Sequence, residues 1–173
     1  MTCHQHPFVP SGTWFFSLRL ADPRSDLLVR EVGLLRHVVS LAMKRRPFVI
    51  EAAVVLPAQL HMIWTLPEGD TDYAARWRMI KSGFSAHMPT PQHLADRPDA
   101  RGGKGIWQRR FWDYQIRDEA DFARHRRMIV EAPVLAGLAA RPQDWALSSV
   151  HRDLRSGGDR TLTTQAADVL SHC

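Results

Sequence analysis

The feature that most constrains the fold is a hairpin pattern in the first half of the chain. Two runs of mainly apolar residues, 48–55 and 59–66, are separated by the turn-forming segment 56–58. Side chains alternate between the two faces of a strand, so Gln59 and His61 are predicted to lie side by side on one face. The second strand therefore carries the geometry of a His-x-His metal pair whose first imidazole is replaced by an amide.

Hydrophobic periodicity and capping residues predict the other elements of a single domain. Strands are expected at 14–20 and 106–116, and helices at 26–46, 72–87 and 118–131. Pro133 is expected to stop the last helix, because proline lacks a backbone donor. The order of these elements predicts an α+β fold, with a mainly antiparallel sheet and helices packed against it.

Two segments show neither a helical nor a strand period. Residues 88–104 hold three prolines and two glycines and are predicted to form a mobile loop over one edge of the sheet. The chain from Ser156 onward is rich in glycine, serine and threonine, so residues 158–173 are predicted to form a disordered C-terminal tail. The folded domain is therefore expected to span 1–157.

The composition is that of a globular protein, with 45% hydrophobic and 24% charged residues. No signal-peptide pattern and no run of membrane-spanning length is seen, so we expect a cytoplasmic protein without a membrane partner. Cys3 and Cys173 lie at opposite ends, which argues against a disulfide framework and against a cysteine zinc site. The net charge of +5 suits a polyanionic partner, although a solvated basic surface gives the same value.

Arginines and tryptophans are interleaved in the strand expected at 106–116. Alternation places Trp107 and Arg109 on one face, and Arg110 and Trp112 on the other. Aromatic rings next to arginines can stack on bases and hold phosphates. An ordinary core strand with a basic exposed face shows the same pattern, so both interpretations stay open.

Three segments together resemble the REP-associated tyrosine transposases, which are single-domain HUH endonucleases related to the single-tyrosine transposases of insertion sequences. These segments are 54–70, 105–112 and 116–125, and they agree with the family in order and spacing. The resemblance runs from about Phe8 to Gly157 and implies an HUH, ferredoxin-like fold. It also implies a single-stranded DNA partner that carries a short hairpin of the REP type, and a homodimer.

The family's chemistry uses a tyrosine hydroxyl that attacks a DNA phosphate and forms a 5′-phosphotyrosine, assisted by Mg²⁺ or Mn²⁺. Aligned through Pro133, the family's nucleophile falls on Met128 and its helix metal ligand on Ala132. The two strand histidines fall on Gln59 and His61. Methionine cannot form a phosphodiester link and alanine has no donor atom, so the resemblance implies a degenerate active site with weak or no metal binding.

The main hypothesis is therefore a transposase-like protein that binds REP-type hairpins without cleaving DNA. Its DNA-binding surface would consist of cations and aromatic rings on the helix at 72–87 and the strand at 106–116: Arg76, Arg78, Lys81, Trp107, Arg109, Arg110 and Trp112. The alternative is an active DNA transposase or endonuclease with a relocated nucleophile, for which the sequence offers only Tyr73 and Tyr114. A decayed protein without any ligand is a third possibility, so whether the chain is an enzyme stays open.

Overall fold

A four-stranded sheet forms the centre of the computed structural model, which describes residues 12–89 and 105–155. Its strands are β1 (Thr13–Arg19), β2 (Val49–Val55), β3 (Gln59–Thr65) and β4 (Trp112–Gln115). They lie in the order β2-β3-β1-β4, and every neighbouring pair is antiparallel. This ferredoxin-like order confirms the predicted α+β fold and the predicted hairpin of β2 and β3.

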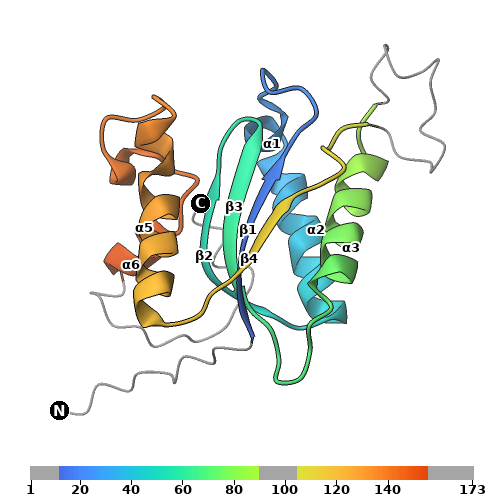
Figure 1. Cartoon of the computed structure of the whole chain (residues 1–173). Coiled ribbons are helices and arrows are strands. Elements are labelled where there is room, and N and C mark those ends of the chain that lie inside the picture. The colour runs from blue at the N-terminus through green and yellow to red at the C-terminus, as the bar shows by residue number, and fades with distance from the viewer. Residues whose placement is uncertain (1–11, 90–104, 156–173) are drawn as a thin grey trace.

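Helices cover both faces of the sheet (Figure 1). One face carries α1 (Leu27–Arg30), α2 (Val32–Arg45) and α3 (Tyr73–Ala86), and the other carries α5 (Glu119–Leu135). After α5 follow the short 3-10 helix η1 (Pro142–Asp144) and α6 (Val150–Arg155). In residues 12–89 and 105–155, no helix is long and apolar enough to cross a membrane.

The alternation of β1 and β3 divides the interior into two cores of unequal size. Phe16 and Trp64 point into the larger core under α2 and α3, where the Trp64 ring stacks on Trp77 with 4.1 Å between centroids. Phe15 and Ile63 point the other way, into a smaller core under α5. Most of the buried aromatic area therefore lies on the α2 and α3 side, while α5 covers its face with fewer side chains.

The predicted helix at 26–46 is divided in two at Glu31, whose ψ of 29° lies outside the helical range. The first part, α1, is attached to the turn between β2 and β3, because the Leu28 amide donates to the Pro57 carbonyl at 3.1 Å. The predicted strand at 106–116 is interrupted as well. Trp107 makes an isolated bridge with Leu20, and regular pairing resumes only at β4.

The last long helix does not stop at Pro133, contrary to the prediction. Pro133 lies inside α5, and the helix ends two residues later in a Schellman motif. Gly137, with φ of +69°, donates to the Val134 carbonyl, and Leu138 donates to the Pro133 carbonyl at 2.9 Å. The left-handed glycine therefore decides the end of the helix. From residue 90 the predicted loop, and the whole predicted tail, lie outside the described residues.

Candidate functional site

The residues predicted to form the site line a pocket between α5 and the sheet. The pocket has a volume of about 370 Å³. Its lining comes from the α5 face of the sheet and from the α5 side of the gap: Phe15, Arg19, Leu56, Gln59, His61, Met128, Ala132, Leu135 and Ala136. Gln59 and His61 belong to β3, whereas Met128 and Ala132 lie one turn apart on α5. The structure therefore brings the four predicted positions together beside the C-terminal half of α5.

His61 belongs to β3, and its surroundings favour the neutral form of its imidazole. Its ring stacks on Phe15 with 5.8 Å between centroids, and its Nδ1 atom is buried without a hydrogen-bond partner. Burial and, to a lesser extent, the nearby Arg19 cation lower the pKa of His61 from 6.5 to about 4. The imidazole is therefore uncharged at neutral pH.

Strand register places Arg19 at the pocket and Ser17 next to its residues Gln59 and His61, and neither was predicted from the sequence. Ser17 pairs with His61 and Arg19 pairs with Gln59 across β1 and β3. The Gln59 amide donates to Ser17 Oγ at 3.0 Å, and Arg19 lines the pocket directly. These residues could have been found only from the register of β1 against β3, because nothing local in β1 indicates it.

The side chains of this pocket do not fit the divalent ion that the family resemblance implies. Mg²⁺ and Mn²⁺ prefer carboxylate, carbonyl and water oxygens. The pocket offers one imidazole and one amide, while Met128 and Ala132 contribute no hard donor. Within the described ranges, no three His, Cys, Asp or Glu side chains come together in a way that could hold a metal ion.

The chain is 40% identical over 157 residues to the REP-associated tyrosine transposase of Escherichia coli (strain K12), a match that covers 91% of this chain and 87% of that protein. This chain belongs to the REP-associated tyrosine transposase family. A Haemophilus influenzae protein named for the same family is 34% identical over 158 residues, covering 90% of this chain and 89% of that protein. No protein-family model matches the chain.

A solved structure shows the same fold in a REP-associated tyrosine transposase bound to a REP hairpin. That structure superposes with a TM-score of 0.74 at 40% identity, and the match covers 91% of this chain and 87% of that chain. The α+β, ferredoxin-like fold that the family resemblance implied is therefore confirmed by the strand order and by this structural match.

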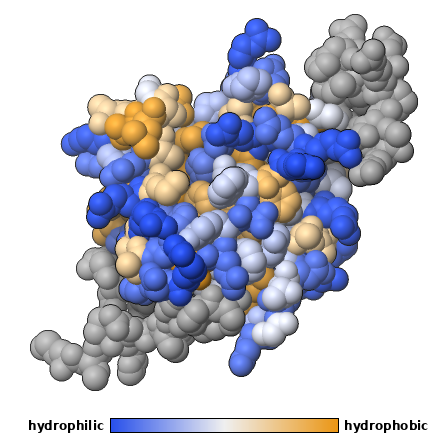
Figure 2. Space-filling model, in the orientation of Figure 1, coloured by the Kyte–Doolittle hydropathy of each residue, from blue (hydrophilic) through white to orange (hydrophobic). Residues whose placement is uncertain are grey.

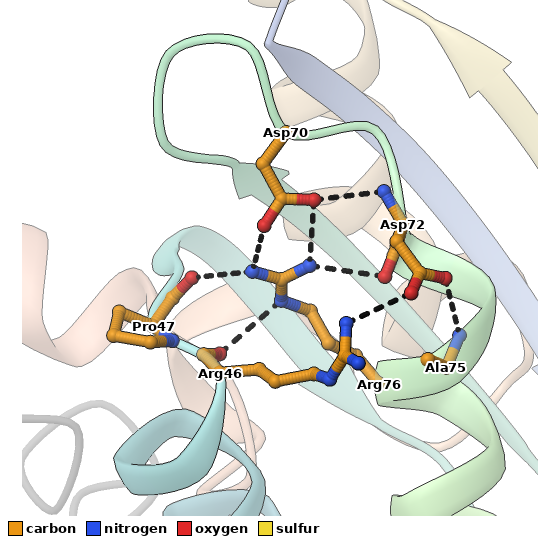
Figure 3. Close-up of polar contacts among 6 residues, drawn as sticks. All are labelled: Arg46, Pro47, Asp70, Asp72, Ala75 and Arg76. Atoms are coloured by element: carbon orange, nitrogen blue, oxygen red, sulfur yellow. Dashed lines mark hydrogen bonds and ion pairs between the residues drawn. The ribbon is translucent and has the colours of Figure 1, made fainter.

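Arg76 was predicted to belong to the DNA-binding surface, which requires an exposed side chain, but the side chain is buried. Its side chain is 1% exposed. The guanidinium donates to both carboxylate oxygens of Asp70 at 2.6 and 3.2 Å, and to the carbonyls of Arg46, Pro47 and Asp72 (Figure 3). These bonds use all its N–H groups. The Arg76 hydrogen bond holds the pKa of Asp70 below its ordinary value, so the pair is ionised.

Trp107 is also unavailable as a stacking platform. It is 8% exposed and meets the Phe84 ring edge-on at 5.5 Å in the larger core. Trp107 lies opposite Leu20, which belongs to the same core, so its side chain points inward. Lys81 is partly buried, and its Nζ donates to the Gln108 carbonyl at 2.8 Å, so it supports the segment before β4. Burial lowers the pKa of Lys81.

The other residues of the predicted DNA-binding surface are exposed. Arg78 lies on the outer side of α3, and Arg109 and Arg110 lie in the irregular segment before β4. Trp112 is 66% exposed and pairs with Ser17, so its side chain stands on the α5 face of the sheet. It therefore shares that face with His61.

Apolar surface adjoins the pocket on the side of α5. Figure 2 shows hydrophobic atoms gathered over the C-terminal end of α5 and the turn that follows it. Met128, at the family's nucleophile position in the predicted alignment, is 48% exposed. Leu135 is also exposed and lines the same pocket. The entrance therefore combines an apolar wall with the polar edge of the sheet.

Neither tyrosine of the chain lines this pocket. Tyr73 lies on the opposite face of the sheet, where its hydroxyl donates to Asp113 at 2.9 Å. Tyr114 lies on the α5 face and stacks on the ring of His125 with 4.7 Å between centroids. His125 in turn packs on Phe15, so rings separate Tyr114 from His61.

Proposed function

We propose that this member of the REP-associated tyrosine transposase family binds single-stranded DNA carrying a REP-type hairpin and does not cleave DNA. The observation that carries the proposal is the convergence of Met128, Ala132, Gln59 and His61 on one pocket. The positions that the family's motif assigns to catalysis lie together in this fold, but the side chains there supply no hydroxyl nucleophile.

Support for DNA binding comes from the relationship to the hairpin-bound transposase. The two chains share 40% identity across 91% of this chain, and both have the same fold. Exposed Arg78, Arg109 and Arg110 can neutralise phosphates, and the exposed indole of Trp112 can stack on an unpaired base. We assign these four residues to the DNA-binding surface, without the buried Arg76 and Trp107 and without Lys81, whose Nζ donates to the Gln108 carbonyl. The homodimer implied by the family resemblance is part of the same proposal.

Support for the absence of cleavage comes from chemistry. The family's reaction needs an oxygen nucleophile and a metal ion that polarises the scissile phosphate. A thioether at Met128 cannot be deprotonated, and the replacement of an imidazole by the Gln59 amide weakens any metal site. Because the nucleophile is absent and the metal site is weakened, we expect no DNA cleavage.

Two measurements test this function. Fluorescence anisotropy compares a labelled single-stranded hairpin with an unstructured strand of the same length over a salt series. We expect tighter, salt-sensitive binding of the hairpin.

Denaturing electrophoresis of protein incubated with the hairpin and Mn²⁺ tests for a covalent adduct, and we expect none. An adduct that disappears in Tyr114→Phe would instead support the relocated nucleophile, and equal binding of both strands would contradict hairpin recognition.

A further inference from the structure

The pocket at His61 has the charge and the hydrogen-bond donors of an anion site. Arg19 is the last residue of β1 and lies opposite Gln59 on β3. Its guanidinium has no ion-pair partner in the described parts of the chain, 12–89 and 105–155. None of the residues that line the pocket is acidic. The positive charge of Arg19 is therefore not neutralised from within the pocket.

His61 adds a neutral donor to the same pocket. Its Nδ1 is buried without a partner, and a buried N–H without an acceptor is costly, so we assign the proton to Nε2. Nε2 is then the nitrogen that can reach the pocket as an N–H donor. A nitrogen that carries a proton offers no lone pair to a metal, whereas it can donate to a phosphate oxygen.

Ser17, the hydrogen-bond partner of Gln59, is a further donor next to the pocket. The Gln59 amide nitrogen donates to Ser17 Oγ, which leaves the Ser17 hydroxyl hydrogen free to donate to another acceptor. Opposite these polar groups stand Met128 and Leu135, which give an apolar wall. A ligand that suits both sides carries a compact anion next to an apolar group, as does a nucleotide with its phosphate and its base or sugar.

We propose that the pocket is a metal-independent phosphodiester subsite, in which the guanidinium of Arg19 supplies the positive charge that a divalent ion supplies in cleaving enzymes. Arg19 donates to the non-bridging phosphate oxygens, His61 Nε2 donates to one of them, and the neighbouring nucleoside lies on Met128 and Leu135. The inference rests on the proposed hairpin binding, and it adds that a backbone phosphate of the single strand beside the hairpin occupies this pocket.

The test measures anisotropy of a labelled hairpin that carries a single-stranded extension, in EDTA and in Mn²⁺. Arg19→Gln is compared with Arg45→Gln, because Arg45 is an exposed arginine at the end of α2, on the opposite face of the sheet. Both variants lose one charge. We expect the wild type to bind equally well in EDTA and in Mn²⁺. Arg19→Gln is expected to lose about tenfold in affinity, as for a hydrogen-bonded charge, with Arg45→Gln within about twofold of the wild type.

A second probe removes the charge from the DNA instead of the protein. Methylphosphonate linkages in the single-stranded extension should weaken the wild type about tenfold and add little to Arg19→Gln, because both changes remove the same contact. Arg19 is exposed, so Arg19→Gln is expected to keep the fold, and its response to the methylphosphonate linkages can be compared directly with that of the wild type. Competition by millimolar inorganic phosphate distinguishes a site for free phosphate from one for DNA, and we expect no effect.

The outcomes separate the subsite from hairpin binding itself. If the wild type binds the hairpin but Arg19→Gln and Arg45→Gln weaken binding equally, the subsite is wrong and hairpin binding stands. Binding that requires Mn²⁺ also overturns the subsite. Displacement of the DNA by inorganic phosphate overturns the assignment to a DNA phosphodiester. If the wild type does not bind the hairpin at all, the proposed function fails and the subsite fails with it.

Discussion

Trp112 on β4 and His61 on β3 stand in one row of the sheet, because both pair with Ser17 on the strand between them. The α5 face therefore presents an exposed indole on one side of Ser17 and a polar pocket on the other. A single strand of DNA that crosses this row could place one base on Trp112 and a phosphate at the pocket.

Replacement of Trp112 should separate binding from folding. We expect Trp112→Ala to leave the free energy of unfolding within about 0.5 kcal/mol of the wild type, because its side chain is mostly exposed. Loss of base stacking should weaken hairpin binding by about 1–3 kcal/mol. Leu154→Ala, at an exposed apolar residue on α6, is the control and should change neither quantity. Equal affinities of Trp112→Ala and Leu154→Ala in anisotropy titrations would contradict the stacking role.

Arg76 should contribute to stability and not to DNA binding. Arg76→Gln leaves the Arg46 and Pro47 carbonyls without their buried donor, so we expect a loss of about 2–3 kcal/mol in urea denaturation. The loss stays moderate because Asp70 remains in contact with solvent. Arg78→Gln, on the exposed side of the same helix, is the matched control, with an expected change below about 0.5 kcal/mol. Similar stabilities of the two variants would show that the Arg76 network is not structural.

The titration of His61 gives a prediction on pH. The folded state lowers the pKa of His61 to about 4 from 6.5, so the unfolded chain binds more protons between these values. The stability contributed by neutral His61 is therefore complete above about pH 6.5 and is lost as the pH falls toward 4. NMR titration of the imidazole should give a midpoint near 4, and Arg19→Gln should raise it, because the Arg19 cation lowers the pKa. A midpoint near 6.5 would show that the ring is not buried.

Two glycines without any atom near an added Cβ allow a matched test of the α5 terminus. Gly137 has φ of +69° in the Schellman motif, whereas Gly33 lies in α2 with ordinary helical geometry. Gly137→Ala should destabilise the protein by about 1 kcal/mol, because alanine is strained in the left-handed region. Gly33→Ala should stabilise it by about 0.5–1 kcal/mol. Thermal unfolding measures both, and shifts of the same sign would contradict the assigned cap.

Restoration of the family's residues tests whether the site is degenerate. Met128→Tyr alone should produce no covalent adduct with DNA, because the new hydroxyl would still lack a metal site. The triple variant Gln59→His, Met128→Tyr, Ala132→Asn completes a histidine pair with His61, supplies a tyrosine hydroxyl at position 128, and places an amide oxygen at position 132 as a metal ligand. We expect a Mn²⁺-dependent adduct only in the triple variant, detected by denaturing electrophoresis. An adduct in the wild type would show that a residue other than Met128 supplies a nucleophile.

The sequence predicted those parts of the fold that local patterns determine. The hairpin at 49–65 is found as expected, because alternation is a property of short segments. The long helices lie where helical periodicity predicted them, although one is divided at Glu31 and another continues past Pro133 to Leu135. Arg76 could not be predicted, since its partners include carbonyls at the end of another helix. Arg19 reaches the pocket through strand register, and register is a property of the assembled sheet. Four positions predicted from sequence patterns line one pocket, whereas Arg19, which lines it as well, was not among them.

The division into two cores has a consequence for how this protein can change over generations. No residue that lines the pocket belongs to the larger core under α2 and α3. A substitution at a pocket position such as 128 or 132 therefore leaves the Trp64 and Trp77 side of the sheet untouched. A lineage can lose its chemistry on one side of such a sheet without losing its fold, which leaves a stable scaffold on which selection can retain or remodel binding.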